Sequence, residues 1–267
     1  MIDLAVRRDL PVLTTLWQTC FGDDVQSIRT FWDALFDDIQ VFVARENGTP
    51  VSMLCALSTS LVNKDNKRFP AAYLYAVCTA PTARGRGYCR SLMSFAEDAL
   101  HRAGICFTAL VPSNDRLFQF YERLGYEAVF YHNTYSVPAV PHEGSIALLH
   151  PEAYRIMRES KLSGSFLSYD TTLLQWQETC GRQSGAGLYR IETGDSICCA
   201  AAEKDGNTLL LKELLPNDPN AAAFLASRLN CTHSIVRTEG KDKPFGMIKT
   251  LCGLPASQYA YLGLAFD

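Results

Sequence analysis

A short loop rich in glycine and arginine, residues 84–89 (Arg-Gly-Arg-Gly-Tyr-Cys), joins an apolar strand pattern to a long amphipathic helix pattern. The strand pattern covers residues 71–79 and the helix pattern covers residues 87–103. Glycine lets the main chain approach a ligand closely and adopt conformations that other residues avoid. The first amides of a helix have no partner inside the helix, and the helix dipole places about half a positive charge at that end. The loop therefore predicts a binding site for a phosphate-bearing ligand.

Two common phosphate-binding loops do not fit this stretch. A Walker loop needs a Gly-Lys-Ser/Thr run that the chain lacks, and the Rossmann pattern needs a glycine at position 90, which is arginine. The spacing instead resembles the Arg/Gln-x-x-Gly-x-Gly/Ala signature of the GNAT acetyltransferase superfamily, with Arg84 first and Gly87 fourth. Cys89 departs from that signature, because it occupies the sixth position, where the family has glycine or alanine.

Two neighbouring segments also resemble blocks of this family. Residues 74–81 (Leu-Tyr-Ala-Val-Cys-Thr-Ala-Pro) are similar to its fourth strand. Residues 113–126 contain Asn114 seven positions before Tyr121 and are similar to the family's "N…FYEKLGF" segment. Because the three blocks occur in the family's order and at its spacing, the N-terminal half is identified as a member of the GNAT family.

The resemblance implies a role for each matching residue. Main-chain groups of Val77 and Thr79 would pair with the pantetheine arm of acetyl-CoA, and an amide there would polarise the thioester carbonyl. Asn114 would hydrogen-bond the pantetheine, and Tyr121 would donate a proton to the departing CoA thiolate. Main-chain amides of the loop would hold the pyrophosphate, with arginine side chains beside them; the loop residues are Arg84, Gly85, Arg86, Gly87, Tyr88 and Cys89.

The chain is expected to form two α+β domains, because its 267 residues exceed the size of a typical single domain. For residues 1–137 the resemblance implies the GNAT fold, a mixed and mostly antiparallel sheet flanked by helices. A proline-containing linker is expected at residues 138–150, followed by a second α+β domain at residues 151–267. Its element order is similar to that of the first half, with a last apolar strand at residues 259–265, but Asn-Asp-Pro-Asn at 217–220 replaces the phosphate loop. The second domain is therefore either a degenerate GNAT-like domain without a CoA site or a plain α+β accessory domain.

Composition excludes several classes of function. Lysine and arginine number 25 against 28 aspartates and glutamates, so the net charge of −3 gives no electrostatic basis for binding nucleic acid or an anionic membrane. The sequence lacks a signal-peptide pattern and any apolar run of membrane-spanning length, so a cytoplasmic location is expected. The ten cysteines lie scattered, several in apolar runs and none in a Cys-x-x-Cys pair, so reduced thiols are expected and a metal site is not.

The sequence thus predicts an acyl-CoA-dependent N-acyltransferase that transfers acetyl from acetyl-CoA directly to a small-molecule or peptide amine. No covalent enzyme intermediate is expected, because neither Cys78 nor Cys89 has a histidine nearby in sequence. The general base stays open, with His132 and the C-terminal carboxylate of Asp267 as candidates. A non-catalytic CoA-binding sensor and a scaffold are the alternative functions. The acceptor and the oligomeric state are not predicted.

Overall fold

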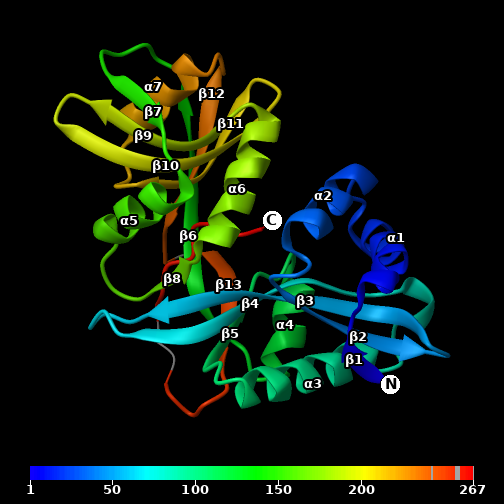
Figure 1. Ribbon diagram of the computed structural model, residues 1–267. Coiled ribbons are helices and arrows are strands. Elements are labelled where there is room, and N and C mark those ends of the chain that lie inside the picture. The colour runs from blue at the N-terminus through cyan, green and yellow to red at the C-terminus, as the bar shows by residue number, and fades with distance from the viewer. Residues whose placement is uncertain (242, 256–258, 267) are drawn as a thin grey trace. The chain divides into compact units, whose positions relative to one another are not determined.

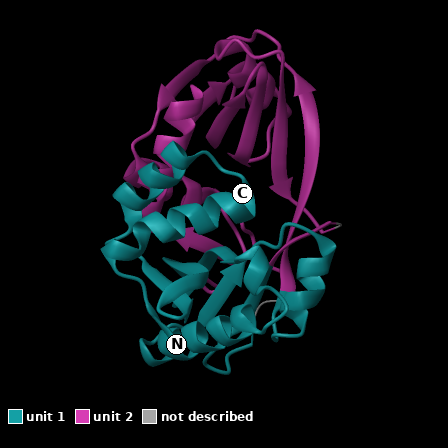
Figure 2. Ribbon diagram, turned by 90° about the vertical axis from the view of Figure 1, so that its right-hand side faces the viewer, with its two compact units in different colours: residues 1–61, 68–127, 247–256 teal, residues 62–67, 128–246, 257–267 magenta. Residues whose placement is uncertain are grey.

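The computed structural model describes residues 1–241, 243–255 and 259–266. Contacts divide the chain into two compact units, which Figure 2 shows in different colours. Unit 1 comprises residues 1–61, 68–127 and 247–256, and unit 2 comprises the remaining residues. The N-terminal part of unit 1 ends at residue 127, whereas the domain boundary was expected at 137, because the strand at residues 127–138 pairs with a strand of unit 2.

Unit 1 contains a sheet in the order β1-β2-β3-β4-β5-β13, in which β1–β2 and β2–β3 are antiparallel and β4–β5 is parallel. The α+β class expected for this half is confirmed. The elements are β1 (Ile2–Leu4), η1 (Arg7–Asp9), α1 (Leu10–Phe21), α2 (Val25–Leu35), β2 (Gln40–Glu46), β3 (Thr49–Val62), β4 (Arg68–Thr79), η2 (Pro81–Ala83), α3 (Tyr88–Arg102), β5 (Phe107–Leu110), α4 (Asp115–Glu122) and β13 (Lys243–Thr250).

Local sequence explains how several of these elements begin and end. Asn47 and Gly48 both have positive φ, as the tight turn between β2 and β3 requires. Asp24 caps α2 by accepting a hydrogen bond from the amide of Ser27 at 2.9 Å. Gly22 ends α1 in the left-handed conformation that helix C-termini favour.

Helices cover both faces of the unit 1 sheet (Figure 1). The buried side chains Leu92 and Ala96 of α3 pack with Leu74 of β4 in one apolar cluster. Tyr75, the next residue along β4, contacts the ring of Trp17 of α1 on the opposite face, with ring centroids 5.4 Å apart. Since successive strand residues point to opposite faces, β4 links the two helical layers.

The C-terminal part of the chain contributes β13 to unit 1. Met247 to Thr250 pair antiparallel with β5, and Met247 is fully buried. The amine of Lys249 forms an ion pair with Glu97 of α3, whose other carboxylate oxygen accepts a hydrogen bond from the Tyr126 hydroxyl at 2.9 Å. The expected domain of residues 151–267 differs from the structure at this strand, because the free edge of β5 is completed by a segment far away in sequence.

Unit 2 contains a sheet in the order β6-β12-β11-β10-β9-β7, with antiparallel pairs except for the parallel pair β11–β12. Strand β7 lies within residues 138–150, where a linker was expected. The elements are β6 (Glu127–Pro138), β7 (Ser145–Leu148), α5 (Pro151–Lys161), β8 (Phe166–Tyr169), α6 (Thr171–Ser184), β9 (Gly187–Thr193), β10 (Ser196–Asp205), β11 (Thr208–Leu215), α7 (Pro219–Arg228) and β12 (His233–Glu239).

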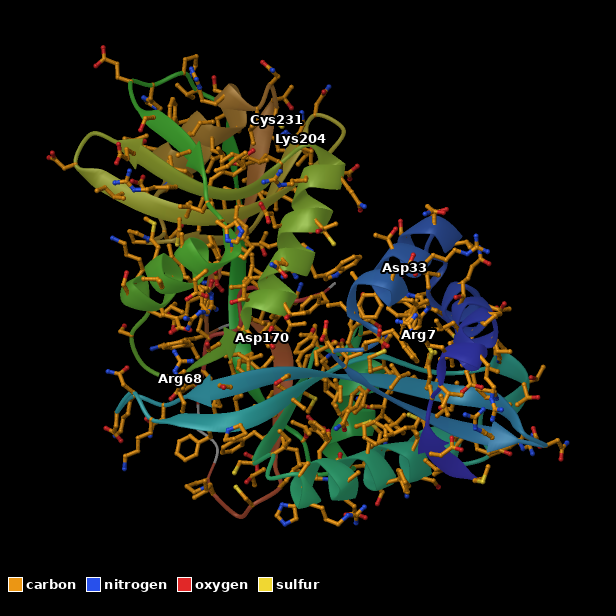
Figure 3. The ribbon with its side chains drawn as sticks, viewed as in Figure 1. Arg7, Asp33, Arg68, Asp170, Lys204 and Cys231 are labelled. Carbon is orange, nitrogen blue, oxygen red and sulfur yellow. The ribbon has the colours of Figure 1, made fainter. Side chains whose placement is uncertain are left out.

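Apart from β8, which lies between α5 and α6, the element order of unit 2 repeats that of unit 1. Two helices, α5 and α6, precede the antiparallel strands β9, β10 and β11, and α7 connects β11 to the parallel strand β12. The same order occurs in α1, α2, β2, β3, β4, α3 and β5. Asp170 caps α6 by accepting a hydrogen bond from the amide of Leu173, and Lys204 of β10 donates to the carbonyl of Leu229 at the end of α7 (Figure 3).

The expected strand at residues 259–265 is a wrong prediction. Only isolated bridges form here, between Ala260 and Phe130 and between Tyr261 and Phe166. The segment is nevertheless buried, with Leu264 fully enclosed. A run of apolar residues indicates that a segment is buried, but a buried segment can be either a paired strand or an irregular loop. Among the residues that the structure describes, no helix is both long and apolar enough to cross a membrane.

A buried ion pair lies inside unit 2. The Nε of Arg158 lies 2.8 Å from Oε2 of Glu213, and the two side chains are only 1% and 0% exposed. The hydroxyl of Tyr154 donates to the same carboxylate oxygen at 2.7 Å, and Nη1 of Arg158 donates to the carbonyl of Leu167 at 3.0 Å. Because both charges are removed from water, each depends on the other for compensation.

Arg158→Leu is therefore expected to lower the free energy of unfolding by about 3–5 kcal/mol, because it leaves the Glu213 carboxylate buried without its cation. Urea unfolding of the full chain measures the effect. The double variant Arg158→Leu/Glu213→Leu should recover a large part of the loss, since no uncompensated charge remains. A single variant that costs under about 1 kcal/mol would contradict this, because such a value is typical of exposed pairs.

Candidate functional site

The sheet of unit 1 opens between β4 and β5. Their pairing register runs from Ala71 to Tyr73, whereas β4 continues to Thr79. Within this extension Ala76 has a φ of 51°, which is a local irregularity in the strand. The end of β4 thus continues past its register with β5.

A cavity of about 720 Å³ in unit 1 includes the end of β4 in its wall. This volume lies in the range of small-molecule and cofactor pockets. Six of the ten predicted site residues line it: Val77, Thr79, Arg84, Cys89, Asn114 and Tyr121. The other lining residues are Cys20, Phe21, Cys78, Ser113, Arg116, Leu117, Gln119, Phe120 and Arg123.

The remaining four predicted residues, Gly85 to Tyr88, form the loop and the first turn of α3. Gly85 and Gly87 have φ values of 75° and 82°, and Gly87 occupies the N-cap position of the helix. In this fully described stretch no side chain caps the helix and no acidic residue lies in its first turn. The amides and the dipole at this end of α3 are therefore available to an anion.

The two arginines of the loop have different surroundings. Arg84 lines the cavity, where its Nε donates to the carbonyl of Thr79 at 3.1 Å and its Nη2 lies 3.9 Å from the sulfur of Cys20. Arg86 forms an ion pair with Glu46 and lies over the ring of Tyr88. The Arg86 guanidinium accordingly holds the pKa of the Glu46 carboxyl below its ordinary value. Arg84 is thus the loop arginine that faces the cavity.

Helix α4 adds positive charge that the sequence reasoning missed. Arg116 and Arg123 line the cavity, together with Gln119 and Phe120. These four positions follow the i, i+3, i+4, i+7 spacing of one helix face, which is the signal that would have identified them. None of the described lining residues is acidic, so the cavity wall is electropositive.

Tyr121 is buried in the cavity wall and 6% exposed. Burial, reinforced by the nearby thiols of Cys89 and Cys78, raises the pKa of its phenol well above the ordinary value. Its ring makes edge contacts with Phe120 and Tyr126. The phenol therefore keeps its proton at neutral pH and is able to donate it inside the cavity.

Asn114 has a structural role in addition to its place in the wall. Its side-chain oxygen accepts a hydrogen bond from the amide of Leu117 at 3.1 Å and so caps α4. Its side-chain nitrogen donates to the hydroxyl of Ser113 at 3.3 Å. The side-chain nitrogen of Asn114 carries a second hydrogen, which it can donate to a ligand.

Three cysteines line the cavity, and sequence reasoning considered only Cys78 and Cys89 in this region. Burial raises the pKa of the Cys89 thiol to about 11. Cys20, at the end of α1, is the added one, and no local pattern marks it because it approaches β4 only through tertiary packing. All ten cysteines of the chain are free thiols.

The corresponding place in unit 2 cannot act as an anion cradle. Asp218 caps α7 and accepts hydrogen bonds from the amides of Asn220 at 2.9 Å and Ala221 at 3.3 Å. A carboxylate therefore occupies the position that an anionic ligand would take, and it repels further negative charge.

Of the two candidate general bases, the structure describes only His132. His132 belongs to unit 2, where its ring packs against Phe245 at a centroid distance of 4.4 Å. It is not among the residues that line the cavity. Asp267 lies outside the described residues.

One family model matches the N-terminal part of the chain. Residues 2–129 match a family described as acetyltransferase (GNAT) domain. A search of curated proteins found no match.

Solved structures share the fold at low sequence identity. A GCN5-related N-acetyltransferase from Anabaena variabilis matches with a TM-score of 0.73 and 13% identity, over 94% of this chain and 73% of that one. One from Kribbella flavida matches with a TM-score of 0.68 and 15% identity, over 94% and 72%. Eis1 from Mycobacterium abscessus matches with a TM-score of 0.66 and 14% identity, over 94% and 74%. The GNAT fold that the sequence predicted is thereby confirmed.

Proposed function

From the premise that residues 2–129 form a GNAT acetyltransferase domain, we propose that the protein transfers an acetyl group from acetyl-CoA directly to an amine of a small molecule or peptide. The observation that carries the proposal is the open N-terminus of α3 in the same unit as an electropositive cavity that Tyr121 lines. Anion binding and proton donation are the two capacities that such a transfer requires.

The residues present fit an acyl-CoA. The free amides after Gly87, with Arg84 nearby, suit the pyrophosphate, because charge-assisted hydrogen bonds to phosphate oxygens are strong. The main chain at Val77 and Thr79 suits the amide groups of the pantetheine arm, which an extended strand recognises by main-chain hydrogen bonds. Asn114 offers its side-chain nitrogen to the same arm.

Acyl-CoA supplies a thioester whose carbonyl carbon accepts the amine. Tyr121 protonates the sulfur that leaves, and its raised pKa ensures that the proton is present at neutral pH. An amide at the end of β4 polarises the carbonyl oxygen. No thiol of the chain takes part in this direct transfer.

A CoA-binding sensor is the second candidate, favoured by one specific observation. Among the described residues that line the cavity there is no aspartate, glutamate or histidine to accept a proton from the amine. In the transferase proposal the amine enters in its neutral form or loses its proton to water, so product formation on an amine panel separates the two functions.

Titration calorimetry with acetyl-CoA tests the proposal. We expect a dissociation constant in the micromolar range, followed by CoA release in the presence of primary amines. Binding without turnover on any amine would leave the sensor. Absence of binding would overturn both and leave a scaffold.

A further inference from the structure

Two thiols from distant parts of the sequence meet in the wall of the unit 1 cavity. Cys20 lies in the last turn of α1, and Cys78 lies next to the end of β4. The two side chains are hydrogen-bonded to each other. The Cys20 sulfur also lies 3.5 Å from the carbonyl oxygen of Thr79, which holds it against the strand. The Cys20 sulfur therefore lies beside the end of β4 that carries Cys78, and both thiols line the same cavity.

The surroundings make the two thiols unequal. The Nη2 of Arg84 lies 3.9 Å from the sulfur of Cys20, and Cys20 is only partly buried. Cys78 is 7% exposed and has the thiols of Cys55 and Cys89 nearby, which oppose a further negative charge. The hydrogen bond from Cys78 and the Arg84 guanidinium lower the pKa of Cys20, whereas that same hydrogen bond and burial raise the pKa of Cys78. This asymmetry is typical of an attacking and a resolving thiol.

We propose that Cys20 and Cys78 form a redox-active dithiol that reduces low-molecular-weight disulfides, and that its oxidised form and bound acyl-CoA exclude each other. The exclusion rests on the proposed function, but the dithiol chemistry does not. Nothing in the GNAT reaction itself requires these two thiols.

The exchange balances in two steps. The Cys20 thiolate attacks one sulfur of a disulfide RSSR, forms a Cys20–S–S–R bond and expels RS⁻, which takes a proton from water. Cys78 then loses its proton to water and attacks the Cys20 sulfur, which expels the second RS⁻. Two protein thiols are oxidised to a disulfide and one RSSR is reduced to two RSH.

Shared residues explain the exclusion. Thr79 and Arg84 both contact the Cys20 sulfur, and both line the cavity. In the proposed function Thr79 binds the pantetheine arm and Arg84 lies near the pyrophosphate. A ligand on this wall covers the Cys20 sulfur, and a disulfide between α1 and β4 changes the wall that the ligand requires.

A second pair of thiols could also form a disulfide, so the experiment uses a variant that lacks this pair. Cys106 and Cys252 also interact with each other, but neither lines the cavity. The double variant Cys106→Ser/Cys252→Ser removes this pair. In that background the full chain is treated with glutathione disulfide, free thiols are alkylated, and tryptic peptides are mapped by mass spectrometry.

We expect one cross-linked product that joins the peptides of Cys20 and Cys78. Cys78→Ala should stop the reaction at a Cys20–glutathione mixed disulfide, Cys20→Ala should abolish it, and the matched variant Cys89→Ala should leave the cross-link unchanged. A chain that remains fully reduced, or a first adduct on Cys78 or Cys89, would overturn the dithiol.

Protection by CoA tests the exclusion. At a CoA concentration 100 times its dissociation constant, the cross-linking rate should fall about 100-fold, because only the free protein reacts. CoA binding without protection would overturn the exclusion. If calorimetry finds no CoA binding while the cross-link still forms, the proposed function fails and the dithiol stands.

Discussion

Replacement of Tyr121 by phenylalanine is expected to lower the turnover number by about 10²–10⁴-fold, the usual contribution of a general acid. The phenol lies in the cavity wall and retains its proton at neutral pH because burial raises its pKa. Phenylalanine preserves the buried ring and its contacts with Phe120 and Tyr126, so the dissociation constant for acetyl-CoA should change by less than about threefold. Steady-state kinetics and calorimetry measure the two quantities.

Tyr126→Phe provides the matched control. Tyr126 is another buried tyrosine of unit 1, and its hydroxyl donates to Glu97 and does not line the cavity. That variant should lose some stability and keep the turnover number.

The wild-type rate should also show no decline from Tyr121 ionisation near the ordinary tyrosine pKa of about 10, since the folded-state pKa is higher. Unchanged turnover in Tyr121→Phe would assign the tyrosine to the core.

Gly87→Glu is expected to weaken acetyl-CoA binding by at least about 100-fold. The substitution places a carboxylate at the N-cap of α3, where it competes with the pyrophosphate for the free amides. Loss of two hydrogen bonds to a charged ligand group, each contributing about 1.5–3 kcal/mol, accounts for this factor. The φ of 82° at this position adds strain of about 1–2 kcal/mol for any residue with a Cβ.

Two further variants separate charge from strain. Gly87→Ala introduces the same strain without the charge, and a Cβ there meets no atom within 4 Å, so it should retain most of the affinity. Gly104→Glu is the matched control, because Gly104 has a φ of 87° and equally open surroundings beyond the other end of α3. Calorimetry measures affinity, and thermal melting confirms folding. Retained affinity in Gly87→Glu would refute the loop as the phosphate site.

Prediction from sequence succeeded where a short segment determines its own structure. The glycines at 85 and 87 adopt the positive φ values that the loop pattern favours, because a short loop depends only on residues close to it in the chain. Apolar periodicity over residues 87–103 placed α3 (Tyr88–Arg102) for the same reason. The role of Tyr121 as proton donor remains a prediction, and its position in the cavity wall is consistent with that role.

Tertiary structure decided what depends on contacts between distant segments. The sequence by itself determined the GNAT fold of unit 1 and the loop before α3, because these features are encoded by local spacing. It did not place β13 beside β5, since an apolar strand pattern carries no information about its partner. Nor did it bring Cys20 to Thr79, 59 residues away, because only the packing of α1 on β4 joins them. Long-range packing therefore chose which side chains share the cavity, and with them the chemistry that it can perform.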